Sequence, residues 1–342
     1  MTMKVLITGV AGFIGSTLAE RLVREGIDVV GIDNFSDYYS RAQKEQNLKW
    51  LHTTVKEPWP RFRFIETRIQ DTDLATLLAD RTHVFHLAGQ PGVRKSWGRD
   101  FDIYTSDNIQ ATQMLLDACV GTSIERLVYA SSSSVYGDVL PANTAPPSAY
   151  WNWARIESRD SRLREDGPAR PVSPYGVSKL AAEHLCSLYH SNYGVPSVSL
   201  RFFTVYGPRQ RPDMAFHKFL LAAHTGQPIT LYGDGQQTRD FTYVDDIVTA
   251  LISAATRGVP GHVYNIGGGT RVTVRQVLHM IERVTGKSLN IVDVGSQKGD
   301  MRHTYADTTL ARTELGFAPT MDLERGLAAE YAWLIAQQAT HR

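Results

Sequence analysis

The sequence predicts an α/β protein built on a doubly wound parallel sheet, with a smaller lobe toward the C-terminus. Short apolar segments alternate with helical patterns along the first 200 residues, and a glycine-rich turn joins the first strand to the first helix. Beyond Thr204 the composition changes, because Gly, Pro, Arg and Gln concentrate in VYGPRQRP and YGDGQQTRD. Strands that alternate with helices imply parallel pairing through right-handed crossovers.

Apolar runs and apolar spacing place the individual elements. The first strand is expected at 4–8, the first helix at 12–25 and the second strand at 27–33. Further strands are expected at 83–89, 126–131 and 196–203, and further helices at 74–79, 103–120 and 174–190. The looser texture beyond Thr204 indicates an added lobe, and no internal repeat interrupts the pattern.

Composition excludes several classes of function. Of 342 residues, 42% are apolar and 21% charged, and the formal net charge is +1. No global field therefore favours nucleic acid or an anionic membrane. No apolar run reaches the roughly 20 residues of a membrane-spanning helix, and the N-terminus does not read as a signal peptide. Cys119 and Cys186 have neither disulfide nor metal spacing, so we expect a cytoplasmic protein without a metal site.

The stretch TGVAGFIG carries the first chemical motif. Gly9, Gly12 and Gly15 lie between a strand and a helix, where glycines let the backbone approach a pyrophosphate at the helix N-terminus. Asp33 ends the second strand, where a carboxylate suits a ribose 2′-hydroxyl and repels a 2′-phosphate. The pattern favours NAD over NADP; the alternative is a set of turn glycines with a solvated Asp33.

A second motif, SPYGVSK, places Tyr175 and Lys179 four residues apart on one face of a helix. A Tyr with a pKa of about 10 is a poor base at neutral pH, but a neighbouring ammonium favours the phenolate. Taken alone, such a pair would favour a position on the protein surface. Four serines, 131–134, end a parallel strand, where ligands of such sheets bind. A hydroxyl there can contact a substrate; Ser131 is the candidate for a purely structural role.

Together, TGVAGFIG, the strand-ending serines, SPYGVSK and GDGQQTRDFTYVDDI resemble the extended short-chain dehydrogenase/reductase family, and within it the nucleotide-sugar 4-epimerases. The resemblance runs nearly end to end. It implies a Rossmann domain at 1–203, to which 241–266 returns, and a UDP-sugar lobe at 204–240 and 267–342. It also implies bound NAD, a homodimer and an insertion at 138–165.

The resemblance also implies roles for individual residues. Ser132 matches the catalytic hydroxyl, Tyr175 the base and Lys179 its partner. Expected cofactor contacts are Gly9, Gly12, Phe13, Ile14, Gly15, Asp33, Asn34, Ile69, Leu87, Ala88, Gly89, Tyr175, Lys179 and Phe202. Expected substrate contacts are Ser133, Ser134, Thr204, Arg211, Arg239 and Arg302. In the implied reaction Tyr175 takes the proton of the sugar O4, the sugar is oxidised at C4 with NAD, turns over, and is reduced on its other face.

The serines discriminate between related reactions. Sugar 4,6-dehydratases carry an acidic pair where Ser133 and Ser134 stand, and UDP-glucuronate decarboxylases place a Glu in the same loop. This sequence has only hydroxyl groups there. The interpretation is oxidation and reduction without elimination or loss of CO2.

The stretch RPDMA resembles the UDP-glucuronate 4-epimerases, in which Arg211 would pair with the C5 carboxylate. A planar guanidinium suits a carboxylate, and a clamped carboxylate resists decarboxylation of the 4-keto sugar. Arg211 could instead pair with Asp213 or bind phosphate. The alternative substrates are UDP-glucose and UDP-galactose. A different class of function, a non-catalytic NAD-binding regulator or scaffold, also stays open.

Three departures from the family pattern stand out. Thr67 and Arg68 replace a Gly-Asp pair whose Asp contacts adenine in the family. Recognition of adenine would then depend on the backbone of Ile69. Arg68 could instead allow NADP to bind, although Asp33 argues for NAD. Gly89 replaces the commoner Ala. Tyr175 follows Ser132 by 43 positions, more than usual, and the surplus falls in 138–165. That insertion could be a lid, a partner surface or an ornament.

Overall fold

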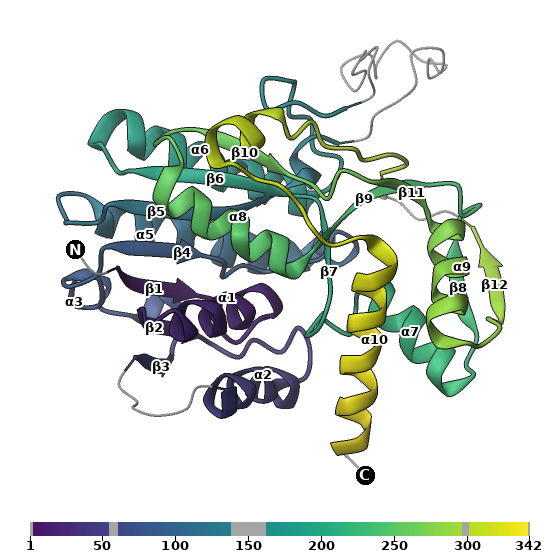
Figure 1. Cartoon of the computed structure of the whole chain (residues 1–342). Helices are drawn as coiled ribbons and strands as arrows, with labels where there is room; N and C mark the ends of the chain where they lie inside the picture. The colour runs from purple at the N-terminus through teal and green to yellow at the C-terminus, as the bar shows by residue number, and fades with distance from the viewer. Residues whose placement is uncertain (1–2, 55–60, 138–161, 296–300, 341–342) are drawn as a thin grey trace.

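A seven-stranded parallel sheet forms the centre of the computed structural model, which describes residues 3–54, 61–137, 162–295 and 301–340. Its strands run in the order β10-β6-β5-β4-β1-β2-β3, with every neighbouring pair parallel (Figure 1). They are β1 (Lys4–Thr8), β2 (Asp28–Asp33), β3 (Phe62–Glu66), β4 (His83–His86), β5 (Arg126–Ser132), β6 (Ser197–Phe202) and β10 (Val263–Ile266). The order reverses between β1 and β4, as in a doubly wound sheet, which confirms the predicted fold class.

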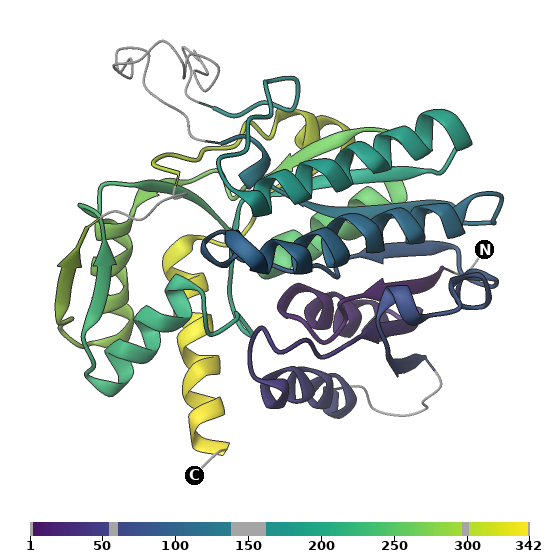
Figure 2. The ribbon, with the colours of Figure 1, turned by 180° about the vertical axis from the view of Figure 1, so that it is seen from behind.

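Both faces of the sheet are buried, because successive side chains of a strand point to opposite sides. In β1, Val5 and Ile7 join one apolar cluster while Leu6 joins the other. Figure 1 shows α1 and α8 over the first face, with α2 beside α1, and Figure 2 shows α5 and α6 over the second. The flanking helices are α1 (Phe13–Arg24), α2 (Arg41–Thr54), α3 (Leu74–Leu78), α5 (Ala111–Cys119), α6 (Pro174–Tyr193) and α8 (Val244–Arg257).

A smaller lobe follows β6, at the carboxyl ends of the parallel strands. The described residues of this lobe form the sheet β11-β9-β7, the parallel pair β12-β8, and three helices. Its elements are β7 (Thr204–Tyr206), α7 (Ala215–Thr225), β8 (Ile229–Tyr232), β9 (Thr238–Tyr243), β11 (Arg271–Thr273), α9 (Val274–Thr285), β12 (Ile291–Val294) and α10 (Leu323–Thr340).

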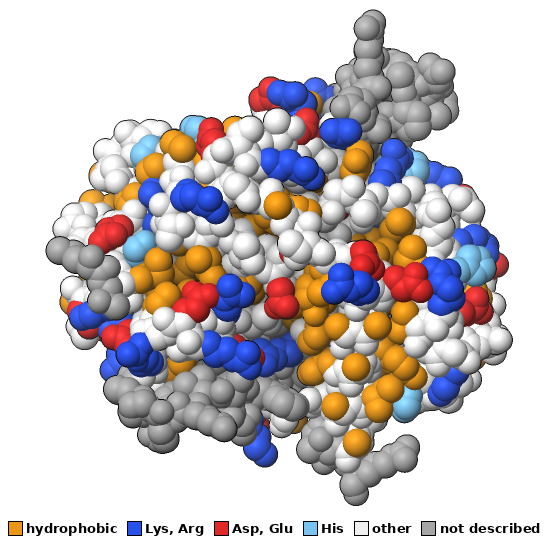
Figure 3. All heavy atoms as spheres, viewed as in Figure 1, with side chains coloured by type: hydrophobic (Ala, Val, Ile, Leu, Met, Phe, Trp, Pro, Cys, Tyr) orange, Lys and Arg blue, Asp and Glu red, His pale blue; other side chains and the backbone are white. Residues whose placement is uncertain are grey.

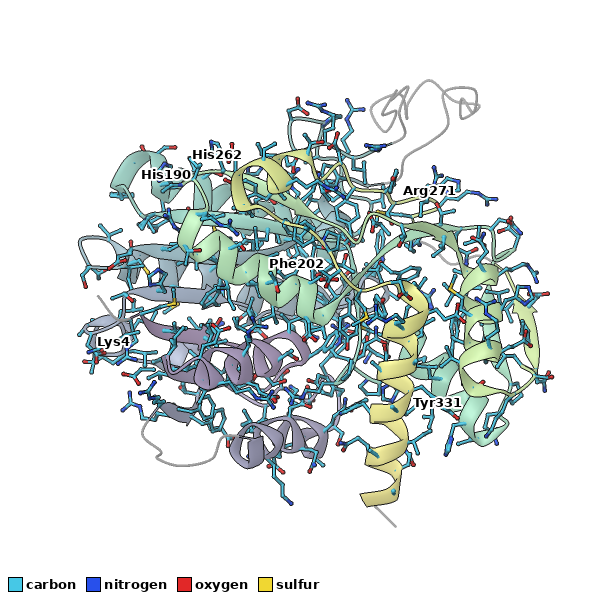
Figure 4. The ribbon with its side chains drawn as sticks, in the orientation of Figure 1. Lys4, His190, Phe202, His262, Arg271 and Tyr331 are labelled. Atoms are coloured by element: carbon cyan, nitrogen blue, oxygen red, sulfur yellow. The ribbon has the colours of Figure 1, made fainter. Side chains whose placement is uncertain are left out.

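The C-terminal helix α10 packs against α7 and α9, and hydrophobic side chains gather over it on the face seen in Figure 3. Tyr331 points from α10 toward α7, where its hydroxyl lies 3.3 Å from His224 Nδ1 (Figure 4). On the other side of α10, Glu330 Oε2 accepts a hydrogen bond of 2.8 Å from the Gly207 N–H. Helix α10 therefore supports the beginning of the loop that follows β7.

The expected helix at 103–120 is divided. It consists of α4 (Phe101–Tyr104), a π-helical turn (Thr105–Gln110) and α5. The strand expected at 83–89 ends at His86, because residues 87–89 turn to pass the glycine-rich loop. Short 3-10 turns occupy Ile69–Asp71, Arg94–Ser96, Gly98–Asp100 and Ser133–Val135, and a second π-helical turn occupies Ala311–Leu315.

The division into domains stays a prediction. Residues 138–161 of the insertion lie outside the described residues. Its end is described: Leu163 forms a parallel bridge with Ala306, and the Glu165 carboxylate accepts a hydrogen bond of 2.7 Å from the Asn265 N–H. Among the helices that the structure describes, none combines the length and apolar character needed to cross a membrane.

Candidate active site

A cavity of about 1020 Å³ opens at the carboxyl ends of the strands, between the sheet and the lobe. Its wall contains every predicted cofactor and catalytic residue and every predicted substrate residue except Arg302. Phe202, labelled in Figure 4, lies at the end of β6 where the sheet meets the lobe. Residues from distant parts of the chain thus share one site.

The glycine-rich turn brings backbone close to backbone at one end of the cavity. A Cβ on Gly9, whose φ is +73°, would lie 2.8 Å from the Ala88 nitrogen, and one on Gly15 would lie 2.2 Å from the Gly9 oxygen. Helix α1 begins at Phe13 without a side-chain cap. Its first N–H groups therefore remain available to a ligand, which is the arrangement that binds a pyrophosphate. The site fits a dinucleotide.

Asp33 is buried, with 9% of its surface exposed, rather than solvated. Its carboxylate accepts hydrogen bonds from the Ala11 N–H at 3.0 Å and the Phe35 N–H at 2.8 Å. Burial raises the pKa of Asp33, and the nearby Lys44 ammonium and these two bonds oppose that rise. The carboxylate both ties the glycine-rich turn to β2 and forms part of the cavity wall.

Tyr175 and Lys179 occupy the first turns of α6. The helix begins after Ser173, whose hydroxyl accepts a hydrogen bond of 3.1 Å from the Gly176 N–H, and Pro174 fills the first helical position. Hydrogen bonding by the Ser132 side chain lowers the pKa of the Tyr175 phenol. Lys179 is only 7% exposed, and its Nζ lies 4.6 Å from the centroid of the Tyr129 ring. Ser132, Tyr175 and Lys179 thus line the same cavity.

Burial dominates the protonation of this trio. It raises the pKa of Tyr175, and the hydrogen bond from Ser132 and the charge of Arg211 pull that pKa down. Burial also lowers the pKa of Lys179 to about 8, while Cys186 and Glu183 act in the opposite direction. Ser132 therefore favours the phenolate of Tyr175 in addition to any contact with substrate.

We expect Ser132→Ala to shift the acidic limb of the pH–rate profile to higher pH, because loss of the hydrogen bond raises the pKa of Tyr175 further. Turnover near neutral pH should fall by about 10²-fold. Ser132→Thr, which keeps the hydroxyl, is the matched control and should restore the limb. An unchanged limb in Ser132→Ala would separate Ser132 from the ionisation of Tyr175.

Lys179 should reduce the stability of the nucleotide-free protein. Its pKa is lowered to about 8, so the folded protein binds this proton less tightly than the unfolded chain does. We expect Lys179→Met to raise the free energy of unfolding at pH 7 by about 1–3 kcal/mol. The gain should shrink as the pH rises above 8, and urea titrations at several pH values measure it. Lys49→Met, on the exposed side of α2, should change stability little.

The four serines, 131–134, make different contacts. The Ser131 hydroxyl donates to Glu183 Oε2 at 2.6 Å, and Arg201 pairs with the same carboxylate, so Ser131 belongs to a buried network. Ser132 Oγ accepts a hydrogen bond of 3.1 Å from the Ser134 N–H and starts the 3-10 turn. Ser133 and Ser134 line the cavity and remain predicted substrate contacts.

Asn108 explains the glycine at position 89. It lies in the π-helical turn, accepts a hydrogen bond of 2.7 Å from the Gln90 N–H, and donates to the Ser178 hydroxyl at 2.9 Å. A Cβ on Gly89 would meet Asn108 Oδ1 at 2.8 Å. The small residue therefore lets Asn108 join α6 to the loop after β4.

We accordingly expect Gly89→Ala to lower the free energy of unfolding by about 1–3 kcal/mol, because Asn108 must move and give up part of this network. Denaturant titration measures the change. Gly295→Ala is the control, since a Cβ there meets nothing within 4 Å. Equal stability of the two variants would contradict the packing argument.

Arg211 lies in the cavity wall and pairs with Asp213. Its Nε donates at 2.9 Å and its Nη2 at 3.0 Å to the two carboxylate oxygens. The Tyr38 hydroxyl donates to Asp213 Oδ2 at 3.3 Å, so the carboxylate is held from two sides. The pairing left open by the sequence thus forms. A guanidinium has five N–H groups, and these two bonds use two of them.

The two predicted diphosphate arginines differ in position. Arg239 lines the cavity, and its Nη1 donates to the Thr238 oxygen at 2.9 Å. Arg302 does not line the cavity; it is 55% exposed and forms an ion pair of 2.9 Å with Asp234. The expectation for Arg302 therefore has no support in this geometry.

Sequence reasoning missed two cavity residues that bridge the sheet and the lobe. Arg94, from the loop after β4, lies over the Tyr232 ring of β8 at 4.2 Å, and Tyr38 reaches Asp213. Both contacts join positions far apart in the chain. Neither residue stands in a motif, so no local signal could have identified them.

The chain matches the NAD dependent epimerase/dehydratase family over residues 5–267. It belongs to this family. The resemblance to NAD-dependent nucleotide-sugar epimerases and the NAD cofactor are confirmed by this match and by the relatives that follow. An uncharacterized UDP-glucose epimerase, YtcB, of Bacillus subtilis (strain 168) is 42% identical over 336 residues, which cover 97% of this chain and 98% of that protein.

Two solved relatives of the epimerase family resemble the structure over nearly its whole length. The UDP-glucuronic acid 4-epimerase of Bacillus cereus, in complex with UDP-glucuronic acid and NAD, has a TM-score of 0.87 and 41% identity, covering 98% of this chain and 100% of that one. MoeE5, solved with UDP-glucuronic acid and NAD and also with UDP-glucose and NAD, has a TM-score of 0.82 and 38% identity, covering 98% and 99%.

Proposed function

We propose that this enzyme of the epimerase family inverts C4 of a UDP-sugar, and that its substrate pair is UDP-glucuronate and UDP-galacturonate. The observation that carries the proposal is that Ser132, Tyr175 and Arg211 line one cavity that also contains the glycine-rich turn. Arg211 and Tyr175 line the same cavity, and the charge of Arg211 lowers the pKa of Tyr175.

The protein's own groups have distinct parts in this reaction. Tyr175 accepts the proton of the sugar O4 and later returns it, and Ser132 orients the hydroxyl and favours the phenolate. Lys179, one turn further along α6, supplies a positive charge to the same cavity. NAD, when bound, supplies reversible oxidation at C4. Ser133, Ser134 and Thr204 provide hydroxyls but no acid, so these three positions supply no group that would drive elimination of water.

Arg211 distinguishes the preferred substrate from its neutral relative. A guanidinium in the wall offers charge-assisted hydrogen bonds to a C5 carboxylate. The complex of the Bacillus cereus enzyme with UDP-glucuronic acid supports this choice. Holding the carboxylate also keeps its C–C bond out of the orientation in which a 4-keto acid loses CO2.

A second candidate is interconversion of UDP-glucose and UDP-galactose. It is favoured by the Arg211–Asp213 pair, which neutralises the guanidinium before substrate arrives. The name of YtcB, an uncharacterized UDP-glucose epimerase, and the complex of MoeE5 with UDP-glucose support the same candidate. The retention of Ser132, Tyr175 and Lys179 around one cavity argues against a non-catalytic scaffold.

The deciding experiment is a proton NMR time course of the protein with NAD and either UDP-glucuronate or UDP-glucose. A new anomeric signal of UDP-galacturonate, formed much faster than UDP-galactose forms from UDP-glucose, supports the first proposal. Faster turnover of UDP-glucose supports the second. A UDP-pentose signal would contradict both, because it would show that the four serines do not prevent decarboxylation.

We also propose that the protein is a cytoplasmic homodimer. Ile103 of α4 and Val177 and Leu188 of α6 are exposed apolar side chains on two helices that pack together. Val177 and Leu188 lie eleven residues apart and so share a face of α6. Light scattering after gel filtration, compared with Leu188→Glu, tests the dimer.

A further inference from the structure

The far end of the cavity, beyond Asp33, is built differently from its middle. Asp33 of β2 lies opposite Glu66 of β3 in the register of these parallel strands. After β3 the chain continues through Arg68, Ile69 and Gln70. These three residues and Asp107 of the π-helical turn line the cavity. In doubly wound folds the pyrophosphate lies on the glycine-rich turn and the ribose on the acidic residue. The purine of the cofactor therefore belongs at this end.

Asp107 is held there by two donors. Its Oδ1 accepts hydrogen bonds from Arg68 Nη2 at 3.3 Å and from Gln70 Nε2 at 3.4 Å. The same two donors hold the Ser106 hydroxyl at 3.1 and 3.2 Å, which ties the π-helical turn to the segment after β3. Asp107 is 20% exposed, and neither contact uses Oδ2. The carboxylate is thus oriented at the cavity wall with one oxygen outside these bonds.

We propose that the Asp107 carboxylate accepts a hydrogen bond from the exocyclic amine of adenine. Arg68 is the positioning residue that orients Asp107. A carboxylate only accepts hydrogen bonds, and adenine presents an N6 amine as donor beside the N1 acceptor. The Ile69 N–H begins a 3-10 turn and can donate to that acceptor. The site then selects a 6-aminopurine dinucleotide and disfavours a 6-oxopurine, whose oxygen would face the carboxylate.

The same contacts assign Arg68 a role other than binding a 2′-phosphate. Its guanidinium is bonded to Ser106 and Asp107, on the purine side of the cavity. Asp33, buried at the ribose position, still disfavours an added phosphate. With Arg68 just after β3, the carboxylate at the purine end of the cavity comes from Asp107 of the π-helical turn.

The inference rests on the proposed NAD-dependent function, but its test needs no sugar. Full-length protein freed of nucleotide is equilibrated with equal concentrations of NAD and nicotinamide hypoxanthine dinucleotide, and the bound ratio is measured by chromatography. We expect wild type to retain NAD over the hypoxanthine analogue by about tenfold or more. Asp107→Ala should bring the ratio close to one. Asp107→Asn, whose amide can donate to O6, should favour the analogue relative to wild type.

The ratio of bound NAD to bound analogue is measured on the same sample of each variant. A general loss of affinity or stability therefore does not by itself change this ratio. Arg68→Met should reduce the preference in part, and Asp102→Asn, on the exposed side of α4, should leave it unchanged. Equal retention of both dinucleotides by wild type, or an undiminished preference in Asp107→Ala, would overturn the assignment while leaving the proposed reaction intact. Failure to retain either dinucleotide would overturn both.

Discussion

Tyr175→Phe is expected to lower turnover of the UDP-sugar by about 10²–10⁴-fold, because the variant has no group to take the O4 proton. The ring remains, so its edge contact with Tyr104, at 6.2 Å between centroids, should persist and the fold should be unchanged. Binding of NAD and of the UDP-sugar should be retained within a few-fold. Loss of kcat with nearly constant KM, followed by NMR, is the expected signature.

Tyr193→Phe is the matched control for this variant. Tyr193 is exposed and is the last residue of α6, far from the first turn of the helix, which carries Tyr175. It should behave as wild type. Substantial turnover in Tyr175→Phe, with the control intact, would show that another group in the cavity serves as base.

Arg211→Met should reduce kcat/KM for UDP-glucuronate by about 10²–10³-fold and that for UDP-glucose by less than about tenfold. Two causes combine for the acidic sugar. The variant loses the cation that would face the sugar carboxylate, and it leaves Asp213 without its partner in the same wall. A second negative charge then repels the substrate.

The double variant Arg211→Met/Asp213→Asn separates these causes. If repulsion by Asp213 contributes, the double variant should recover part of the activity toward UDP-glucuronate. If both sugars lose activity equally in Arg211→Met, then Arg211 contacts the nucleotide or supports the loop, and the assignment of the acidic sugar is wrong. Steady-state kinetics of the single and the double variant, each with UDP-glucuronate and with UDP-glucose, measure these effects.

The sequence predicted most of the sheet, and it predicted residues that line one cavity, because both depend on local patterns; the roles of those residues stay predictions. Strand-helix alternation determined the sheet class, and motif residues stand at strand ends, which topology gathers at one edge. The role of Arg302, which was expected from the resemblance, stays a prediction: its side chain pairs with Asp234 and does not line the cavity. Contacts such as Arg211–Asp213 and Arg94–Tyr232 depend on side-chain packing, which a sequence pattern does not specify.

Other misses have similar causes. Helix α2 and strand β3 carry weak apolar patterns, and only their contacts with the glycine-rich turn and β2 show their place. The π-helical turn that positions Asn108 has no signature of its own in an otherwise helical stretch. The reason for Gly89 became visible only when Asn108 was found against it.

The position of β10 at the edge of the large sheet has a consequence for how the chain is made. The chain leaves that sheet after β6, builds β7, α7, β8 and β9, and returns only at Val263–Ile266. During synthesis the outer edge of β6 therefore stays unpaired until residue 266 has left the ribosome. An open, apolar strand edge is a site for aggregation. The lobe cannot be removed or exchanged as a single terminal cassette, because a chain cut at the first boundary would keep that edge exposed.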